Sequence, residues 1–391
     1  MRTRTGARRR HGHGLGSGHG HGHGNGDGHR SHHVTGSDQR PAPVPHPPQV
    51  ADPHPVGAYS LPVTHAIPPF RPAWWLRGAH AQTIGGRLLR PRRVAALRRE
   101  RIDTPDGDFL DLDWAVASDG GDRPLVVLLH GLEGSARSGY AVELYRQLHR
   151  VGLDAVGLNF RSCSGEPNRR PRLYHSGETG DLEHLLEMLR ARFPQRPLAA
   201  VGVSLGGNVL LVHLGRRGDD TPLAAAAVIS VPFDLAAGSV ALDRPVGRHI
   251  YLRVLLRSMQ AKARARAAEL AAAGADIPRA LAARGFAEFD DALTAPIHGF
   301  SGVDDYYGTC SSGRWLPGVR RPTALLHALD DPFMPADAVA HDAIAANPHL
   351  VPAIQSHGGH VGFIEGAVPL RPRFWAEREA ARFLAAVVAG R

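Results

Sequence analysis

The sequence predicts an α/β protein with a mostly parallel central sheet and helices on both of its faces. From about residue 102 onward, short apolar runs alternate with helical segments of about 10–15 residues, which is the pattern of successive βαβ units. Hydrophobic residues make up 43% of the 391 residues and charged residues 21%, so the chain can bury a sizeable core.

Continuous apolar runs are typical of strands that are buried on both faces. We expect such strands at residues 125–129, 153–159, 198–203, 224–231, 323–327 and 350–355. We expect helices at residues 140–150, 180–193, 205–214 and 336–345, and a final helix at about residues 373–388. Thr179 is the expected N-cap of the second helix, whose first turn carries Asp181 and Glu183, where the helix dipole favours acids.

Residues 236–300 interrupt this alternation. They lack strand patterns and contain a basic run from Arg253 to Arg266 and an alanine-rich stretch from Ala261 to Ala283. Because helix-forming residues dominate, we expect a helical insertion that covers the sheet as a lid. The core then consists of residues 67–235 and 301–391.

Residues 1–66 differ from the rest of the chain. Residues 1–33 are of low complexity, with histidines that largely alternate with glycine from His11 onward, and seven prolines lie between Pro41 and Pro55. Few apolar residues are available to offset the entropy of ordering, so we expect a disordered arm. Neutral imidazoles bind nickel, copper and zinc, so the arm could bind metal weakly in many registers, with an incidental repeat as the alternative.

Charge, hydropathy and cysteine content argue against a nucleic-acid-binding, membrane-spanning or disulfide-bonded protein. A second basic cluster, residues 87–101, holds seven arginines and one glutamate without interleaved aromatics. We expect a solvated, partly ion-paired face there and no nucleic-acid partner. The apolar runs are shorter than a spanning helix requires, so no stable membrane insertion is expected. The two cysteines, Cys163 and Cys310, suit a reducing, cytoplasmic location.

One motif indicates nucleophilic chemistry. Gly202-Val-Ser204-Leu-Gly206 follows the apolar run 198–203 directly and precedes a helical run. This strand-turn-helix setting is the one that exposes a nucleophilic serine. Ser204 is therefore the predicted nucleophile, and the backbone N–H of Leu205 is one predicted donor to an oxyanion.

A serine hydroxyl needs a base, and the base needs an orienting acid, which here should follow in chain order. The loop after residues 323–327 offers Asp331, which we prefer because it precedes a proline, with Asp330 as the alternative. The loop after residues 350–355 offers His360 as the base, and His357 as a supporting or exposed histidine. The second oxyanion donor should lie in the loop after the first central strand, at the N–H of Leu132.

Nine stretches together resemble the YheT-like, or embryogenesis-associated, family of α/β-hydrolases over about residues 67–391. They are Trp75–Thr83, His130–Gly134, Arg161–Asn168, Tyr174–Thr179, Gly202–Asn208, Asp290–Pro296, Asp304–Tyr307, Ala328–Met334 and Gly358–Phe363. The resemblance implies an α/β-hydrolase fold and a charge-relay set at Ser204, Asp331 and His360. It also implies carboxylesterase or lipase activity. The chain departs from the family pattern at Ser162, where glycine is usual, and in residues 1–66.

The sequence therefore predicts a serine hydrolase without metal or organic cofactor. Its substrate would be a small acyl ester with a short to medium chain, or a lipid, cleaved through an acyl-enzyme. An acyltransferase with the same triad is one alternative. A metal-binding role for the histidine-rich arm is the other.

Overall fold

An eight-stranded sheet forms the centre of the protein. The computed structural model describes residues 67–91, 97–116, 122–369 and 371–389, so the expectations for residues 1–66 lie outside the described residues. The strands are β1 (Arg98–Asp103), β2 (Phe109–Ala115), β3 (Leu125–Leu129), β4 (Asp154–Asn159), β5 (Leu198–Val203), β6 (Leu223–Ile229), β7 (Thr323–Ala328) and β8 (Leu350–Gln355). Their order across the sheet is β1-β2-β4-β3-β5-β6-β7-β8.

The sheet is parallel from β4 to β8, and β1 and β2 add an antiparallel edge. The six apolar strands lie where the sequence predicts them, within one to two residues. The sequence prediction missed β1 and β2, because β1 is mostly charged. Its arginines pair across the strands instead: Arg99 with Asp113 at 2.7 Å and Arg101 with Asp111 at 2.8 Å.

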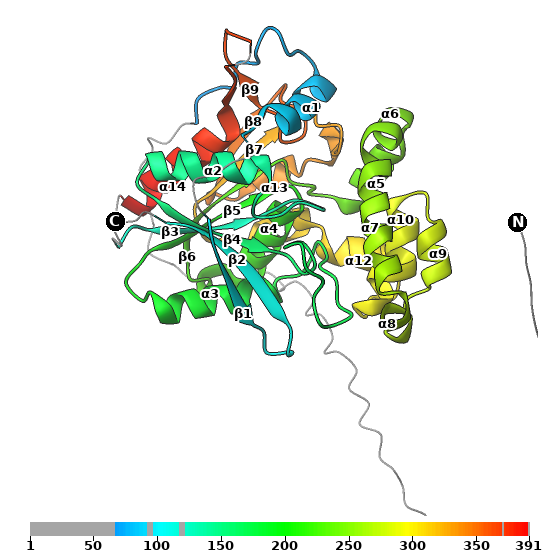
Figure 1. Cartoon of the computed structure of the whole chain (residues 1–391). Coiled ribbons are helices and arrows are strands. Elements are labelled where there is room, and N and C mark those ends of the chain that lie inside the picture. The colour runs from blue at the N-terminus through cyan, green and yellow to red at the C-terminus, as the bar shows by residue number, and fades with distance from the viewer. Residues whose placement is uncertain (1–66, 92–96, 117–121, 370, 390–391) are drawn as a thin grey trace, which may run out of the picture. The chain divides into compact units, whose positions relative to one another are not determined.

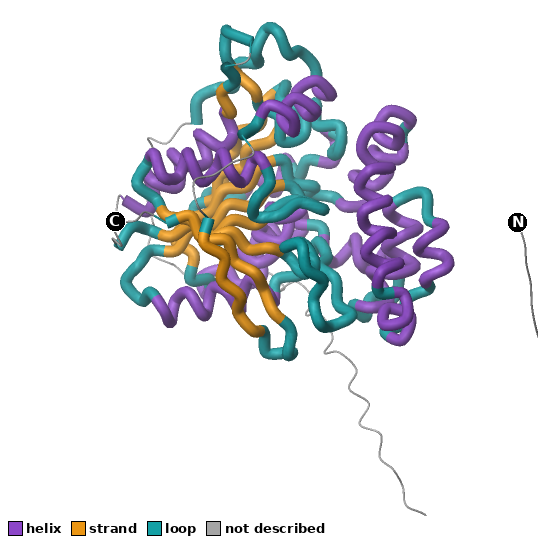
Figure 2. Tube along the Cα trace, viewed as in Figure 1, coloured by secondary structure: helices purple, strands orange, loops and turns teal. Residues whose placement is uncertain are grey.

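Helices cover both faces of the sheet, as expected (Figures 1 and 2). One face packs on α2 (Gly139–Arg150) and α14 (Trp375–Ala389) through a core that includes Val126, Val201 and Leu384. The other face packs on α3 (Gly180–Arg192) and α4 (Leu205–Arg217). Short elements complete the fold: α1 (Ala79–Leu89), α13 (His341–Ala346) and a small hairpin of β9 (Ile364–Glu365) and β10 (Arg373–Phe374).

Two local predictions need correction. The helix expected at residues 336–345 is a 3₁₀ turn, Ala336–Ala338, followed by the short α13. Thr179 occupies the N-cap position of α3 but makes no capping hydrogen bond with its side chain. The carboxylate of Glu178 accepts the free N–H of Gly180 instead, at 2.9 Å.

Helices fill the chain between β6 and β7 and lie beyond the carboxyl ends of the strands (Figure 1). They enclose a core of their own around Leu256, Leu270 and Phe289, and continue past the predicted limit of residue 300. The helical elements are α5 (Leu235–Asp243), α6 (Pro245–Gly247), a π-helical turn (Arg248–Leu252), α7 (Arg253–Ala265), α8 (Ala267–Ala272), α9 (Ile277–Ala282), α10 (Phe286–Phe289), a second π-helical turn (Asp290–Thr294), α11 (Ala295–Ile297), α12 (Val303–Cys310) and a 3₁₀ segment (Ser312–Gly318).

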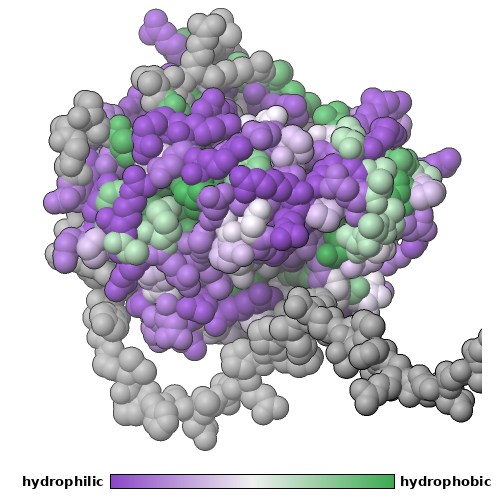
Figure 3. Space-filling view, turned by 60° about the horizontal axis from the view of Figure 1, so that its bottom comes forward, coloured by the Kyte–Doolittle hydropathy of each residue, from purple (hydrophilic) through white to green (hydrophobic). Residues whose placement is uncertain are grey.

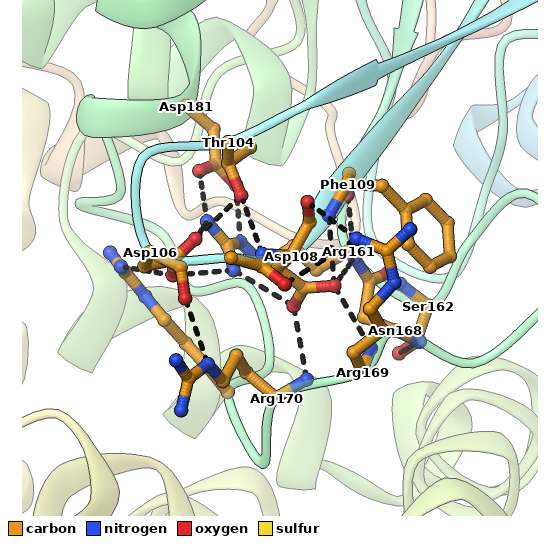
Figure 4. Close-up of polar contacts among 12 residues, drawn as sticks. Thr104, Asp106, Asp108, Phe109, Arg161, Ser162, Asn168, Arg169, Arg170 and Asp181 are labelled. Atoms are coloured by element: carbon orange, nitrogen blue, oxygen red, sulfur yellow. Dashed lines mark hydrogen bonds and ion pairs between the residues drawn. The ribbon is translucent and has the colours of Figure 1, made fainter.

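A buried polar network ties the β1–β2 turn to the loop that follows β4 (Figure 4). The guanidinium of Arg161 bonds Asp108 at 3.0 Å and Asp181 at 2.7 Å. Asp108 also accepts the side-chain amide of Asn168 at 2.9 Å. Burial alone would raise the pKa of Asp108, but hydrogen bonds, chiefly from the N–H of Arg169, outweigh it and lower that pKa. The network fixes the loop that runs on to Tyr174.

This loop also explains the departure from the family pattern at Ser162. Its φ is 61°, in the left-handed region that glycine enters without a steric cost. Two hydrogen bonds hold the serine there: its N–H donates to Asn168 Oδ1 at 2.6 Å, and its hydroxyl accepts the Asn168 N–H at 3.2 Å.

The basic cluster at residues 87–101 has more than one environment. The part on β1 is ion-paired, in line with the predicted partly paired face: its members are Arg98, Arg99 and Arg101. Arg90 is different, because it is buried and bonds the buried carboxylate of Glu377 at 2.5 Å. Residues 92–96 lie outside the described residues. Hydrophilic residues predominate on the face of the molecule shown in Figure 3.

Candidate active site

Ser204 lies in the turn between β5 and α4, at the carboxyl edge of the sheet. Its φ and ψ are 52° and −120°, a conformation that non-glycine residues rarely adopt. The flanking glycines permit the turn. A Cβ on Gly202 would lie 2.5 Å from the Gly206 carbonyl oxygen, and one on Gly206 would lie 2.4 Å from that of Leu129. Both glycines of the motif therefore lie where any side chain would clash with a neighbouring backbone segment.

The structure brings the predicted base and acid to Ser204. His360 Nε2 lies 3.0 Å from Ser204 Oγ, and His360 Nδ1 lies 2.8 Å from Asp331 Oδ2. Asp331 follows β7 and is buried, and its other oxygen accepts the Phe333 N–H at 2.8 Å. With Nδ1–H donating to Asp331, the lone pair of Nε2 faces the serine hydroxyl.

The two alternative residues lie beside this set and outside it. Asp330 Oδ1 accepts the N–H of Gly359 at 2.8 Å, so Asp330 stabilises the loop that carries His360. Its other oxygen lies 3.4 Å from His357 Nδ1, and the His357 side chain is 67% exposed. Neither residue touches Ser204 or His360 in the described hydrogen-bond network.

Helix α1 contacts the loop that carries His360, and no sequence pattern predicts this contact. Thr83 Oγ1 accepts the backbone N–H of His360 at 2.9 Å. The ring of Phe333 stacks on the imidazole of His360, with centroids 4.0 Å apart and planes 12° apart. Thr83 lies in the stretch Trp75–Thr83 of the family resemblance, which was the available signal.

The loop after β3 carries the predicted oxyanion donor of Leu132. His130 Nδ1 lies 2.8 Å from the Gly131 carbonyl oxygen, and its Nε2 accepts the Phe160 N–H at 3.0 Å. Both contacts suit a neutral ring, and burial lowers the pKa of His130 to about 4. Because a trans peptide directs its C=O and N–H oppositely, this contact turns the Leu132 N–H away from His130. That N–H makes no hydrogen bond within the described residues.

Leu205 supplies the other predicted donor. It is the first residue of α4, and the first N–H groups of a helix have no partner within the helix. The loop of Gly131 passes directly beside Ser204, since a Cβ on Gly131 would lie 3.2 Å from Ser204 Cβ. Both predicted donors therefore flank Ser204.

Glu133 joins the loop after β3, which carries Leu132, to the helical insertion. Its backbone is left-handed, with φ 54°, and its N–H donates to the Tyr174 hydroxyl at 2.8 Å. Its carboxylate accepts Tyr174 Oη at 2.9 Å, Lys262 Nζ at 2.7 Å and the hydroxyl of Ser258. Lys262 and Ser258 lie on α7, and Lys262 is the only lysine of the chain. No sequence pattern indicates the contacts of Glu133 with Lys262 and Ser258, which we call the Glu133 latch.

Ser204 and His360 open into a cavity of about 870 Å³ between the sheet edge and the insertion. This volume lies within the usual range of small-molecule sites. Its walls are largely apolar, and the residues that line it come from both parts of the fold. Those from the insertion include Leu242, Tyr251, Leu255, Met259, Phe286 and Tyr306.

One side-chain cluster has the residue types of a metal site. His175, Glu178 and His298 place ligand atoms within 4.8 Å of one another. Arg172, however, already pairs with the Glu178 carboxylate. Burial and then the charges of Arg172 and Arg216 lower the pKa of His175 to about 3. Because the surroundings already disfavour a cation, we assign no metal to this cluster.

Comparison with known proteins shows the family of the chain. A model of the alpha/beta hydrolase fold family matches residues 124–367. YheT of Escherichia coli (strain K12) is 41% identical over 317 residues, which cover 79% of this chain and 90% of that protein. The chain belongs to the YheT-like group of α/β hydrolases. The predicted fold class and family are thereby confirmed.

One further relative and one solved structure add to this comparison. Phospholipase ABHD3 of Mus musculus is 33% identical over 328 residues, which cover 82% of this chain and 79% of that protein. An esterase structure from Pyrococcus furiosus superposes with a TM-score of 0.51 at 14% identity, over 76% of this chain and 97% of that one. The structural match shows the fold alone. Together with the sequence relatives, the family assignment makes the chain an α/β hydrolase of the esterase and lipase type.

Proposed function

We propose that the protein hydrolyses carboxylic esters through Ser204, His360 and Asp331. The substrates are acyl esters of short to medium chain length, or lipids. The observation that carries the proposal is the chain of two contacts from Ser204 Oγ to His360 Nε2, at 3.0 Å, and from His360 Nδ1 to Asp331, at 2.8 Å. The apolar cavity beside Ser204 and the name phospholipase of a relative support an acyl substrate.

In the first half-reaction, His360 Nε2 takes the proton of the Ser204 hydroxyl as Oγ attacks the ester carbonyl carbon. The carbonyl oxygen becomes an oxyanion, which the N–H groups of Leu132 and Leu205 bind. His360 then gives its proton to the departing alkoxide, and the acyl group stays on Ser204. Asp331 keeps the imidazole oriented and stabilises its charged form.

In the second half-reaction, His360 takes a proton from water, and the hydroxide attacks the acyl-enzyme. The tetrahedral intermediate uses the same two N–H donors. Its collapse breaks the bond to Ser204 Oγ, which regains a proton from His360. The products are a carboxylic acid and the free enzyme, and no metal or organic cofactor takes part.

A p-nitrophenyl ester series from acetate to palmitate tests this function. We expect turnover with a maximum at one chain length, because a cavity of about 870 Å³ has room for acyl groups of limited length. Absence of turnover on every ester would contradict the proposal. The same assay with added glycerol distinguishes hydrolysis from acyl transfer, which shares the chemistry up to the acyl-enzyme. We expect free acid as the main product.

Two remaining expectations are part of the proposal. Cys163 and Cys310 are both free thiols, which supports a cytoplasmic location. Metal binding by the histidine-rich arm concerns residues outside the described structure. Its test is metal titration of the full chain.

A further inference from the structure

We propose that the mouth of the active-site cavity docks on an anionic lipid surface and receives ester substrates from it. The inference rests on the proposed ester hydrolysis and adds the place where the substrate is met. The docking surface, which we call the rim, consists of the exposed residues of α1 and of residues 240–257. No described helix is long and apolar enough to cross a bilayer.

Exposed apolar side chains concentrate on the rim. Nine large hydrophobic residues are exposed in the described part of the chain, and six of them lie on these two segments. Ile84 and Leu88 are four residues apart on α1, and Leu88 is 60% exposed. The other four are Val240, Val246, Ile250 and Val254. Scattered exposed apolar residues need no explanation, but a cluster at one place indicates an interaction surface.

Four of the six exposed apolar residues of the rim line the cavity that contains Ser204. Ile84, Leu88, Ile250 and Val254 line the same cavity as Ser204. The two segments also touch, since His80 Nδ1 of α1 lies 2.9 Å from the Tyr251 hydroxyl. An ester leaving an apolar layer pressed on the rim would reach Ser204 without crossing water.

The rim carries a net positive charge, which favours an anionic partner. Helix α1 has one arginine and no acid, and residues 240–257 hold four arginines and one acid, Asp243. Arg87, Arg244, Arg253 and Arg257 are exposed and have no carboxylate partner among the described residues. Arginines interleaved with exposed apolar residues are the pattern by which proteins hold an anionic lipid interface.

The same charge argues against two other occupants. Residues 1–66 contain seven arginines and three aspartates, so the arm and the rim have the same sign. A second copy of the chain would likewise set basic rim against basic rim. An anionic lipid surface satisfies both the apolar stripes and the arginines.

Co-sedimentation of the full chain with lipid vesicles tests the proposal. The vesicles are phosphatidylcholine alone, or with about one third phosphatidylglycerol. We expect binding to the anionic vesicles that weakens as salt rises, because salt shortens the range of the charge interactions. Val240→Asp with Val246→Asp, and separately Arg253→Gln with Arg257→Gln, should each weaken binding about tenfold or more.

Matched controls separate the rim from the rest of the surface. Val368→Asp replaces an exposed valine elsewhere, and Arg150→Gln with Arg190→Gln removes two exposed arginines from α2 and α3. We expect these variants to bind as the unchanged chain does. None of the substituted residues lines the cavity, so all variants should hydrolyse a soluble short-chain ester normally.

Two results would overturn the proposal. One is no binding of the unchanged chain to anionic vesicles. The other is equal binding by the rim variants, which would assign the contact to another basic segment such as residues 1–66. Ser204→Ala should bind vesicles as the unchanged chain does. If rim variants lose binding while no ester is hydrolysed, the ester hydrolysis fails and the docking surface stands.

Discussion

His130 shows how a residue outside the reacting set can decide the geometry of the site. Its ring donates through Nδ1 and accepts through Nε2, so only the neutral form makes both contacts. With a pKa of about 4, the ring stays neutral throughout the pH range in which a triad histidine works. Its task is to hold the Gly131–Leu132 peptide.

The first prediction concerns this positioning residue. His130→Leu should lower kcat by about tenfold to a hundredfold with little change in KM, because the Leu132 N–H loses its orientation toward the oxyanion. Steady-state kinetics on a soluble ester measure the effect, and a thermal melt shows whether the fold persists. An unchanged kcat in a folded variant would contradict the positioning role.

The second prediction concerns Asp290, one of the residues that line the cavity. Burial raises its pKa to about 6, although hydrogen bonds from Thr294 and Tyr307 oppose the rise. Between pH values of about 4 and 6, the folded state therefore binds more protons than the unfolded state, and stability falls as the pH rises. Asp290→Asn should remove this slope and stabilise the fold near neutral pH by up to about 3 kcal/mol, because each pH unit by which the pKa is raised corresponds to about 1.4 kcal/mol.

Denaturant unfolding across this pH range tests the second prediction. Asp291→Asn is the matched control at the next position. The Val303 N–H and then Arg279 lower the pKa of Asp291, so its stabilising contribution is present above the unfolded pKa and is lost toward acid pH. An Asp290→Asn variant that is less stable than the unchanged chain near neutral pH would contradict the account.

At the scale of elements, the Glu133 latch connects α7 to the loop that carries Leu132, the proposed oxyanion donor. The partners are far apart in sequence, with Glu133 and Lys262 separated by 129 residues. Removing one member of a buried ion pair leaves the other without its partner, which is the costly change. The position of the insertion and the geometry of the oxyanion donors are therefore coupled.

The third prediction follows from this coupling. Glu133→Gln and Lys262→Met should each lower kcat by about tenfold, because α7 and the Leu132 peptide are no longer held together. Arg279→Met is the matched control, since it removes a cation from an exposed ion pair of the insertion with Asp291. Equal effects of Lys262→Met and Arg279→Met on kcat would show that the latch has no special role.

Elements with a local signature could be predicted from the sequence. The six apolar strands and the turn at Ser204 follow from continuous apolar runs and a glycine-flanked serine. Strand β1 has no apolar run, so its sequence does not indicate a strand. Cross-strand ion pairs such as Arg101 with Asp111 stabilise it instead. The support of His360 by Thr83 joins residues 277 apart, and no spacing rule predicts such a contact.

At the scale of the whole molecule, the chain order explains how the candidate site assembles. Ser204, Asp331 and His360 follow three parallel strands, β5, β7 and β8, whose carboxyl ends meet at one edge of the sheet. The insertion leaves the sheet after β6 and returns before β7, so it lies over that same edge. The sequence predicts the catalytic order, but the shape of the cavity and its rim depend on packing among the insertion helices.

The central claim is that Ser204 is the nucleophile of an acyl-enzyme. The most direct measurement is peptide mass mapping after treatment with a fluorophosphonate. We predict one adduct per chain, on the peptide that contains Ser204, and no adduct in Ser204→Ala, together with a loss of about 10⁴-fold or more in kcat. An adduct on another residue, or ester turnover that survives in Ser204→Ala, would contradict the account.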